Sequence, residues 1–448
     1  MREKLLELSI LFISVIKWVF FAVCIGILVG VSTTVFLKSL DFGISLAQKL
    51  PYYYLLLPLA LLVSTLIIHY LAPQAKGHGT EKVIEAVHKF SGKINPLVVP
   101  IKLVATIITI SFGGSAGKEG PAAQIGAGLC SIFSDLLRFN ESDRKKLVIC
   151  GISAGFATVF GTPIAGAIFG VEVLFVGTML YDVLLPSFVA GIIGYHVSSS
   201  LGITYFHEPL KVVPTFTSLF FITVCFSGIF FGLISLLFIE TFRFFEKISK
   251  NSKLNLFSKP IIGGLILIVL TFIFSENYLG LGLETIKKAI EGEHISPIAF
   301  MLKILFTSIT LNFGGSGGVV TPLFFVGATA GNTFGILFGL DRSLFASIGM
   351  VSLLAGAANT PIAASIMAVE LFGPQIAPYA ALACIISFLI TGHRSIYPSQ
   401  VLAMAKSTSL SIEKGKELRE IIEIIYQPRP KSLSAILFQL IKKFFNRS

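Results

Sequence analysis

Two charged residues, Lys118 and Glu119, lie side by side in the stretch Gly113 to Gly128, which reads GGSAGKEGPAAQIGAG. Apolar segments flank this stretch, KLVATIITISF before it and LCSIF after it. A charged side chain at the centre of a bilayer costs about 2.5 to 3.5 kcal/mol on insertion scales, so it persists where it faces water or binds something. The pair therefore indicates a functional site at membrane depth, with an ordinary solvent loop as the alternative.

The glycines and the proline around the pair predict the start of a helix. Pro121 suits a first helical turn, where unpaired N–H groups and the positive end of the helix dipole lie. Such an end binds an anion without a full positive charge, and a weakly held ion can leave again. The Glu119 carboxylate, which is tethered to the chain, then competes with the anion for this site. We predict that it acts as a gate.

A second copy of this motif occurs about two hundred residues later. Residues 112–128, FGGSAGKEGPAAQIGAG, match residues 313–329, FGGSGGVVTPLFFVGAT. In the same way TPIAGAIFGVEVLF at 162–175 matches TPIAASIMAVELF at 360–372. The two pairs have offsets of 201 and 198 residues, which indicates a duplicated chain.

The duplication predicts two membrane halves, residues 1–205 and 206–404, followed by a short cytoplasmic tail at 405–448. Duplicated segments interrupted by glycine and proline point to an ion site near the bilayer midplane. The sequence does not say whether the repeat is inverted or parallel, and a shared packing motif without a site is the alternative. The second copy has Val320 where the first has Glu119, so only one half carries the carboxylate.

Three other features supply candidate residues. His78 and Gly79 precede a helix-like pattern in AKGHGTEKVIEAVHKF, where a contact with an anion and a plain loop histidine are equally compatible. Tyr397 follows a long apolar segment, and its hydroxyl is either an anion donor or an interfacial group. Ser115 and His196 leave open an intramembrane serine protease, although the equivalent serine in the second copy favours turn chemistry.

The composition places the chain in a membrane. Of its 448 residues 54% are hydrophobic and 13% are charged, whereas soluble domains have about 25% charged residues. Several apolar segments are interrupted, or are too long for one span and too short for two, which predicts broken or re-entrant helices. The net charge of +11 fits basic cytoplasmic loops and does not imply nucleic-acid binding. The five cysteines lack metal-like spacing, and we expect no metal and no cofactor.

Both ends of the chain favour a multi-pass protein of the cell membrane with cytoplasmic termini. The first apolar segment is too long for a signal peptide, so we interpret it as a retained helix. Basic residues lie near the N-terminus, at Arg2 and Lys4, and in the tail, at Lys414 and Lys416. The last segment, LSAILFQLIKKFFNRS at 433–448, predicts an amphipathic stretch on the membrane surface.

Together these motifs resemble the CLC family of chloride channels and proton-coupled chloride transporters, over about residues 15–405. GKEGP is similar to the family's GREGP, AKGHG to its GSGIP and GGVVTP to its GGIFAP. The resemblance implies an all-α polytopic membrane protein with a CLC-type inverted repeat and broken, re-entrant helices. It also implies a homodimer in the lipid bilayer, with an anion pathway in each subunit. It makes Glu119 the gate and gives as anion-binding residues His78, Gly79, Lys118, Gly120, Val319, Val320 and Tyr397.

The departure that bears most on mechanism is Val173. The resemblance implies that transporters of the family carry a second glutamate there on the proton's route, whereas valine carries no proton and Glu172 is only a neighbour. We therefore predict a voltage-gated chloride channel and no enzyme. Proton-coupled chloride exchange and a preference for fluoride or nitrate are the alternatives. The chain departs from the family motifs at four further positions: His78 replaces a serine, Glu81 a proline, Lys118 an arginine and Val320 a phenylalanine.

Overall fold

The structure is a computed structural model that describes residues 2–210, 217–421, 423–427, 432 and 435–437. Helices α1 to α16 account for most of this part of the chain, and its strands are only two residues long. The predicted amphipathic segment at 433–448 lies almost entirely outside the described residues. The all-helical architecture predicted from the sequence is confirmed.

The two halves of the chain contain the same succession of eight helices. The first half has α1 (Arg2–Ala47), α2 (Leu57–Leu71), α3 (Thr80–Lys89), α4 (Val98–Ser111), α5 (Glu119–Leu136), α6 (Glu141–Phe160), α7 (Pro163–Glu172) and α8 (Tyr181–Ser200). The second half has α9 (Ser218–Asn251), α10 (Ser258–Ile273), α11 (Leu283–Ile290), α12 (Ala299–Asn312), α13 (Val320–Phe338), α14 (Arg342–Ala358), α15 (Pro361–Phe372) and α16 (Ala377–Thr391).

Short elements connect these helices. The single-turn 3-10 helices are η1 (Tyr53–Leu56), η2 (Pro73–Ala75), η3 (Glu276–Tyr278), η4 (Pro374–Ile376) and η5 (Leu418–Glu420). The strands are β1 (Phe175–Val176), β2 (Val401–Leu402), β3 (Leu410–Ser411) and β4 (Ile425–Tyr426). Most of them lie where the chain leaves or enters a helix.

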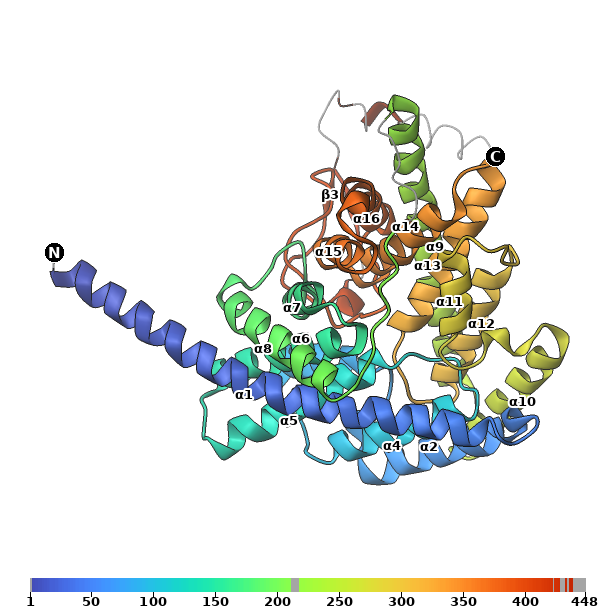
Figure 1. Ribbon diagram of the computed structural model, residues 1–448, viewed down its shortest axis with the longest axis horizontal. Helices are drawn as coiled ribbons and strands as arrows, with labels where there is room; N and C mark the ends of the chain where they lie inside the picture. The colour runs from blue at the N-terminus through green and yellow to red at the C-terminus, as the bar shows by residue number, and fades with distance from the viewer. Residues whose placement is uncertain (1, 211–216, 422, 428–431, 433–434, 438–448) are drawn as a thin grey trace.

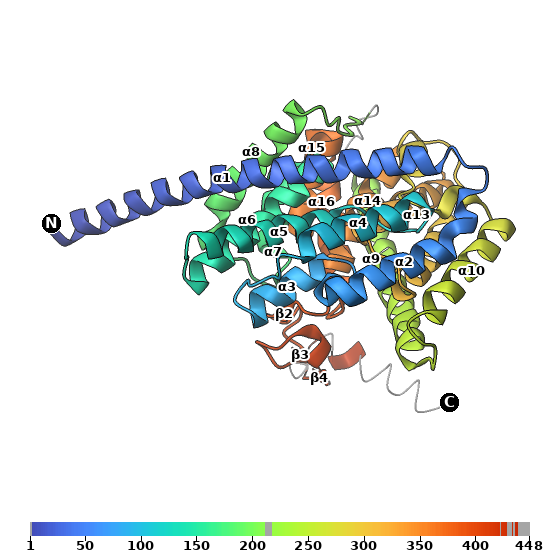
Figure 2. The same ribbon diagram turned by 90° about the horizontal axis from the view of Figure 1, so that it is seen from below.

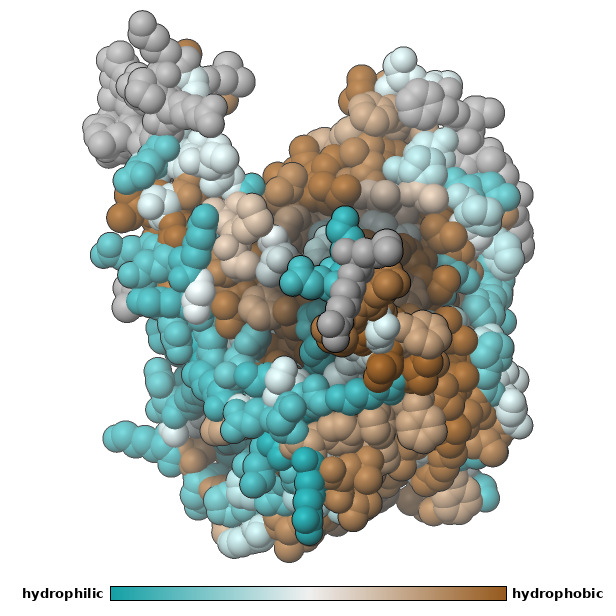
Figure 3. Space-filling model, turned by 90° about the vertical axis from the view of Figure 1, so that its left-hand side faces the viewer, coloured by the Kyte–Doolittle hydropathy of each residue, from teal (hydrophilic) through white to brown (hydrophobic). Residues whose placement is uncertain are grey.

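Helix lengths and the surface agree with a membrane location. Among the described residues six helices are long and apolar enough to cross a membrane, whereas others such as α3 and α7 have only ten residues. Ten residues rise about 15 Å, half of a bilayer's hydrocarbon core. Large apolar side chains such as Phe42 and Leu219 are exposed, and Figure 3 shows a broad hydrophobic surface bordered by hydrophilic residues. Helix α1 extends beyond the other helices at its N-terminal end (Figure 1).

Reciprocal hydrogen bonds join the two halves. The backbone N–H of Ser115 donates to the Thr310 hydroxyl at 3.1 Å, and that of Ser316 donates to the Thr109 hydroxyl at 3.0 Å. Ser115 is equivalent to Ser316 in the repeat, and Thr109 to Thr310. Each half therefore donates one of these hydrogen bonds to the other half and accepts the equivalent one from it. An exchange of this kind is the signature of a two-fold relation between two copies.

The C-terminal segment returns to the helical body instead of hanging free. Strand β2 pairs in parallel with β1, and β3 pairs with β4 in an antiparallel hairpin. A small apolar cluster of Val176, Leu402, Ile412 and Leu418 holds the segment in place. In Figure 2 β2 lies next to α3, and Ser399 just before β2 hydrogen-bonds Glu81 of α3, so the residues that follow Tyr397 are anchored against that helix.

Candidate anion site

The starts of α5 and α13 meet in the interior of the protein. The Gly117 N–H donates to the Gly318 carbonyl oxygen at 2.7 Å, and the Gly318 N–H donates back to the Gly117 oxygen at 2.6 Å. Helix α5 begins two residues later at Glu119, and α13 begins two residues later at Val320. The repeat thus places two helix N-termini, each with unpaired N–H groups and a positive dipole end, next to each other.

The Glu119 carboxylate fills the first turn of α13. It is fully buried, and its Oε1 atom accepts hydrogen bonds from the backbone N–H groups of Val320 at 2.5 Å and Thr321 at 3.0 Å. Its Oε2 atom accepts from the Thr321 hydroxyl at 2.6 Å. These donors are the groups with which a helix N-terminus binds an anion. A side chain of the first half therefore occupies an anion-binding position built by the second half.

The segment His78–Gly79 closes the same region from a third direction. Gly79 caps α3 with a φ of 84°, and a Cβ atom at this position would overlap the Gly120 carbonyl oxygen. Only a glycine lets the start of α3 approach the start of α5 so closely. The ring of His78 is buried, 5.5 Å from the ring of Tyr397, and its Nδ1 atom has no hydrogen-bond partner among the described residues.

Tyr397 completes the group from the end of the second half. Its side chain is fully buried, and its hydroxyl faces Thr80 without a well-formed hydrogen bond to any described residue. The charges of Glu119 and Glu81 are both close enough to act on this hydroxyl. A buried hydroxyl without an acceptor has a donor free for an anion.

Most of the residues singled out in the sequence thus lie together, with two exceptions. Glu119, Gly120, His78, Gly79 and the Val319–Val320 turn surround one region, with Tyr397 against His78. Lys118 caps α5 with a half-buried side chain, and its ammonium group makes no ion pair with a described residue. Val173 is fully buried at the end of α7, where its carbonyl oxygen accepts a hydrogen bond from Gln400 at 2.8 Å.

Glu172, the neighbour of Val173, has a structural partner of its own. Its carboxylate accepts hydrogen bonds from the backbone N–H groups of Ile362 at 3.0 Å and Ala363 at 2.8 Å, at the start of α15. Glu370 near the end of α15 does the same for Ile164 and Ala165 at the start of α7. The two glutamates therefore cap each other's helices in a reciprocal pair.

Two residues of the region did not figure among the sequence-based candidates. Thr321 supplies two of the three donors to Glu119. The sequence feature that could have pointed to it is a hydroxyl residue in the first turn of the second motif copy. Glu81 lies one turn from His78 and was noted only as a substitution for the motif's proline. The hydrolytic alternative finds no support in the described residues, since the Ser115 hydroxyl pairs with Thr307 at 3.0 Å and His196 is exposed on α8.

Comparison with known proteins gives the family. The chain belongs to the voltage-gated chloride channel family, whose model matches residues 59–392, and the predicted CLC membership is confirmed. A chloride/fluoride channel protein of Pseudomonas syringae pv. tomato is 38% identical over 402 residues, which cover 87% of each protein. An H(+)/Cl(−) exchange transporter of Klebsiella pneumoniae is 25% identical over 386 residues, covering 79% of this chain and 80% of that one.

A solved structure gives the same result for the fold. The crystal structure of a CLC-type fluoride/proton antiporter superimposes with a TM-score of 0.82 at 30% identity, covering 86% of this chain and 98% of the other. The chain is therefore a multi-pass membrane protein of a family that consists of anion channels and anion transporters.

Proposed function

We propose that this protein carries fluoride across a membrane in exchange for protons, and that Glu119 couples the two. The observation that carries the proposal is the Glu119 carboxylate at the start of α13, held by two backbone N–H groups and one hydroxyl. Two similar proteins support the choice of ion, since one is named a chloride/fluoride channel and the other a fluoride/proton antiporter.

The coupling follows from competition for one set of donors. An incoming anion needs the N–H and O–H groups that Glu119 occupies, so the carboxylate must leave before the anion is bound. A proton on Glu119 removes the charge that holds it at the helix N-terminus and frees these donors. Anion entry is thereby linked to proton uptake by one side chain.

Fluoride suits a site with compact, strong donors. It is a small anion that keeps its water tightly, so a protein must replace that water with directed hydrogen bonds. The Val320 N–H, the Thr321 N–H and the Thr321 hydroxyl already converge on one carboxylate at distances of 2.5 to 3.0 Å. We propose that His78, Gly79, Lys118, Gly120, Val319 and Tyr397 shape the rest of the anion's path.

Flux measurements on purified protein in liposomes test this function. Vesicles loaded with fluoride are diluted into fluoride-free buffer with a potassium shunt, and fluoride and external pH are recorded together. The exchange predicts that protons move against fluoride at a fixed ratio, and that an imposed proton gradient drives fluoride uphill. Fluoride or chloride release without any proton movement would contradict it.

The second candidate is the gated chloride channel that the sequence predicts. Val173 favours it, because this buried position at the end of α7 carries no acid for a proton's route. Passive chloride release that depends on voltage, without a fixed proton ratio, is the result that would support the channel. The same liposome measurement, repeated with chloride under a potassium diffusion potential, separates the two candidates.

We further propose the setting in which the protein acts. Residues 1–205 and 206–404 form the two membrane halves, and 405–448 form a tail in the cytoplasm together with the N-terminus. The assembly is a homodimer in the cell membrane, with one anion path in each subunit, as the family resemblance implies. Cross-linking in native membranes and protease access to tagged termini check these assignments.

A further inference from the structure

A half-buried carboxyl that the anion site does not use lies at the start of α3. The Glu81 carboxylate accepts two hydrogen bonds from Ser399, one from its hydroxyl at 2.6 Å and one from its backbone N–H at 3.0 Å. Ser399 follows Tyr397 by two residues, and Glu81 follows His78 by three. Glu81 therefore joins the two segments that bring His78 and Tyr397 to the anion site.

The groups of the anion site nearest to Glu81 are polar and lack partners. His78 Nδ1 and the Tyr397 hydroxyl are both buried, and neither makes a well-formed hydrogen bond with a described residue. The charges of Glu81 and Glu119 both act on the Tyr397 hydroxyl. Two carboxyl groups near the same unpaired donors and acceptors have the layout of a proton path.

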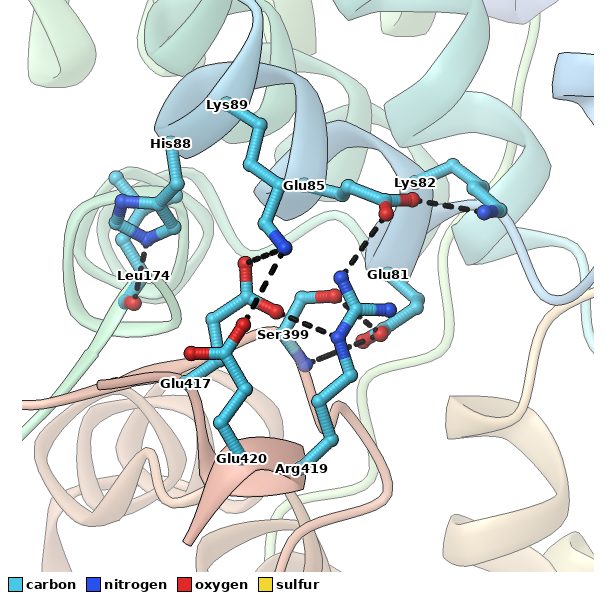
Figure 4. A network of polar contacts seen from close by, with 10 residues as sticks. All are labelled: Glu81, Lys82, Glu85, His88, Lys89, Leu174, Ser399, Glu417, Arg419 and Glu420. Carbon is cyan, nitrogen blue, oxygen red and sulfur yellow. Dashed lines mark hydrogen bonds and ion pairs between the residues drawn. The ribbon is translucent and has the colours of Figure 1, made fainter.

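Glu81 also connects to the outside of the protein through a charged cluster of α3 and the tail (Figure 4). Arg419 pairs with Glu85 at 2.9 Å and with Glu417 at 2.6 Å, and Lys89 pairs with Glu417 at 3.1 Å. The Glu81 side chain itself is only partly exposed, next to these charges. The cluster thus places ionised, partly exposed groups beside Glu81.

The charge balance around Glu81 suits proton exchange near neutral pH. Burial raises the pKa of the Glu81 carboxyl to about 7, against the hydrogen bonds from Ser399 and the positive charges of Arg419 and Lys82, which lower it. The titratable groups that face it are Lys82 and Glu85 on α3, Arg419 and Glu417 in the tail, and Tyr397. A group that is half protonated near the working pH both accepts and releases protons readily.

We propose that Glu81 is the second proton-carrying carboxyl of this transporter, at a different place from the position that Val173 leaves without an acid. The proposal rests on the proposed fluoride/proton exchange. In the step, the Glu81 carboxyl loses its proton and becomes a carboxylate, and the Glu119 carboxylate gains that proton and becomes neutral. Water, His78 Nδ1 and the Tyr397 hydroxyl pass the proton on, and solution on the side of the tail returns one to Glu81.

The test compares Glu81→Gln with Glu85→Gln in liposomes, with fluoride and pH recorded together. Glu81→Gln keeps the size and the hydrogen-bonding shape of the side chain but cannot titrate, so we expect proton flux to fall at least about tenfold while fluoride still crosses. Glu85→Gln removes a carboxylate from the same helix, one turn further on, and is expected to leave the proton-to-fluoride ratio at the wild-type value.

The outcomes separate this proposal from the exchange on which it rests. A wild-type protein that moves fluoride without protons overturns the exchange and this proposal with it. A wild-type protein that couples normally, together with an unchanged ratio in Glu81→Gln, overturns only the role of Glu81.

A purely structural role of Glu81, in which it pins the Tyr397 segment through Ser399, is tested with Ser399→Ala. The proton path predicts that Ser399→Ala keeps proton transport, whereas pinning predicts the same loss as in Glu81→Gln and would overturn the proposal. If Glu81→Gln does not yield folded protein, Glu81→Asp gives the answer. Its pH profile of proton flux is expected to shift relative to wild type, and an unshifted profile counts against the relay.

Discussion

The two copies of the glycine-rich motif share their backbone geometry and differ in their chemistry. Gly117 and Gly318 exchange hydrogen bonds, and each motif opens a helix two residues later. The first copy then offers the carboxylate of Glu119, whereas the second offers the N–H groups of Val320 and Thr321 to receive it. A symmetric frame has thus become a site with an acid on one side and hydrogen-bond donors on the other.

The same division recurs at the starts of α3 and α11. Gly79, the N-cap of α3, packs against the Gly120 carbonyl group, whereas its equivalent Gly282, the N-cap of α11, packs against the ring of Phe325. Lys102 binds the Gly77 carbonyl oxygen beside His78, and its equivalent Lys303 binds that of Gly280. The first half therefore packs the start of α3 against the start of α5 in the anion site, whereas the second half packs the start of α11 against the Phe325 side chain of α13.

The largest expected effect comes from Gly79→Ala compared with Gly280→Ala. A Cβ atom at residue 79 would overlap the Gly120 carbonyl, so we expect a loss of about 3 kcal/mol of stability and most of the fluoride transport. Gly280→Ala meets no neighbour and should cost about 1 kcal/mol, for its positive φ alone. Thermal unfolding in detergent and liposome flux measure both. A Gly79→Ala protein as stable and active as wild type would contradict the close approach of α3 to Gly120.

Lys102→Met and Lys303→Met come next. Each variant leaves two backbone carbonyl groups, one of them buried, without their shared donor. The loss costs about 1 to 3 kcal/mol, so both variants should unfold at lower temperature. Only Lys102→Met should also slow fluoride transport, because Gly77 immediately precedes His78. Equal losses of transport in the two variants would show that the lysines support the fold alone.

Thr321→Val and Val320→Ala separate side-chain donors from backbone donors. Thr321→Val removes the hydroxyl that lies 2.6 Å from Glu119, and we expect the fluoride KM to rise about tenfold, since one hydrogen bond to an anion contributes about 1.5 kcal/mol. Val320→Ala keeps the backbone N–H and should leave the KM near the wild-type value. Initial rates of fluoride efflux at graded concentrations give both values. A larger rise of the KM in Val320→Ala than in Thr321→Val would show that the donors are assigned wrongly.

The smallest effects are expected for Glu172→Gln and Glu370→Gln. Each removes a negative charge from a helix N-terminus while it keeps an oxygen acceptor, which costs about 0.5 to 1 kcal/mol. The reciprocal capping predicts similar losses of stability and an unchanged proton-to-fluoride ratio in both variants. A ratio that collapses in Glu172→Gln alone would instead make Glu172 a proton carrier.

The sequence predicted the helix starts and the duplication because both are written in local patterns. Glycines followed by Pro121 and Pro322 mark α5 and α13, and the repeat offset pairs their motifs. The sequence could not predict that Glu81 would meet Ser399, 318 residues away, because that contact depends on how the tail folds back against α3. The sequence likewise showed Glu172 only as a neighbour of Val173. Its capping role became visible in its hydrogen bonds to the start of α15, which is far away in the chain.

The most direct test of the central claim is the proton and fluoride flux of Glu119→Gln, recorded in the same vesicles as wild type. If the carboxylate and the anion compete for the donors at the start of α13, the neutral variant competes for those donors more weakly and carries no proton. We therefore predict that fluoride crosses passively, with no accompanying proton movement. Proton-coupled fluoride transport at the wild-type ratio in Glu119→Gln would contradict the account.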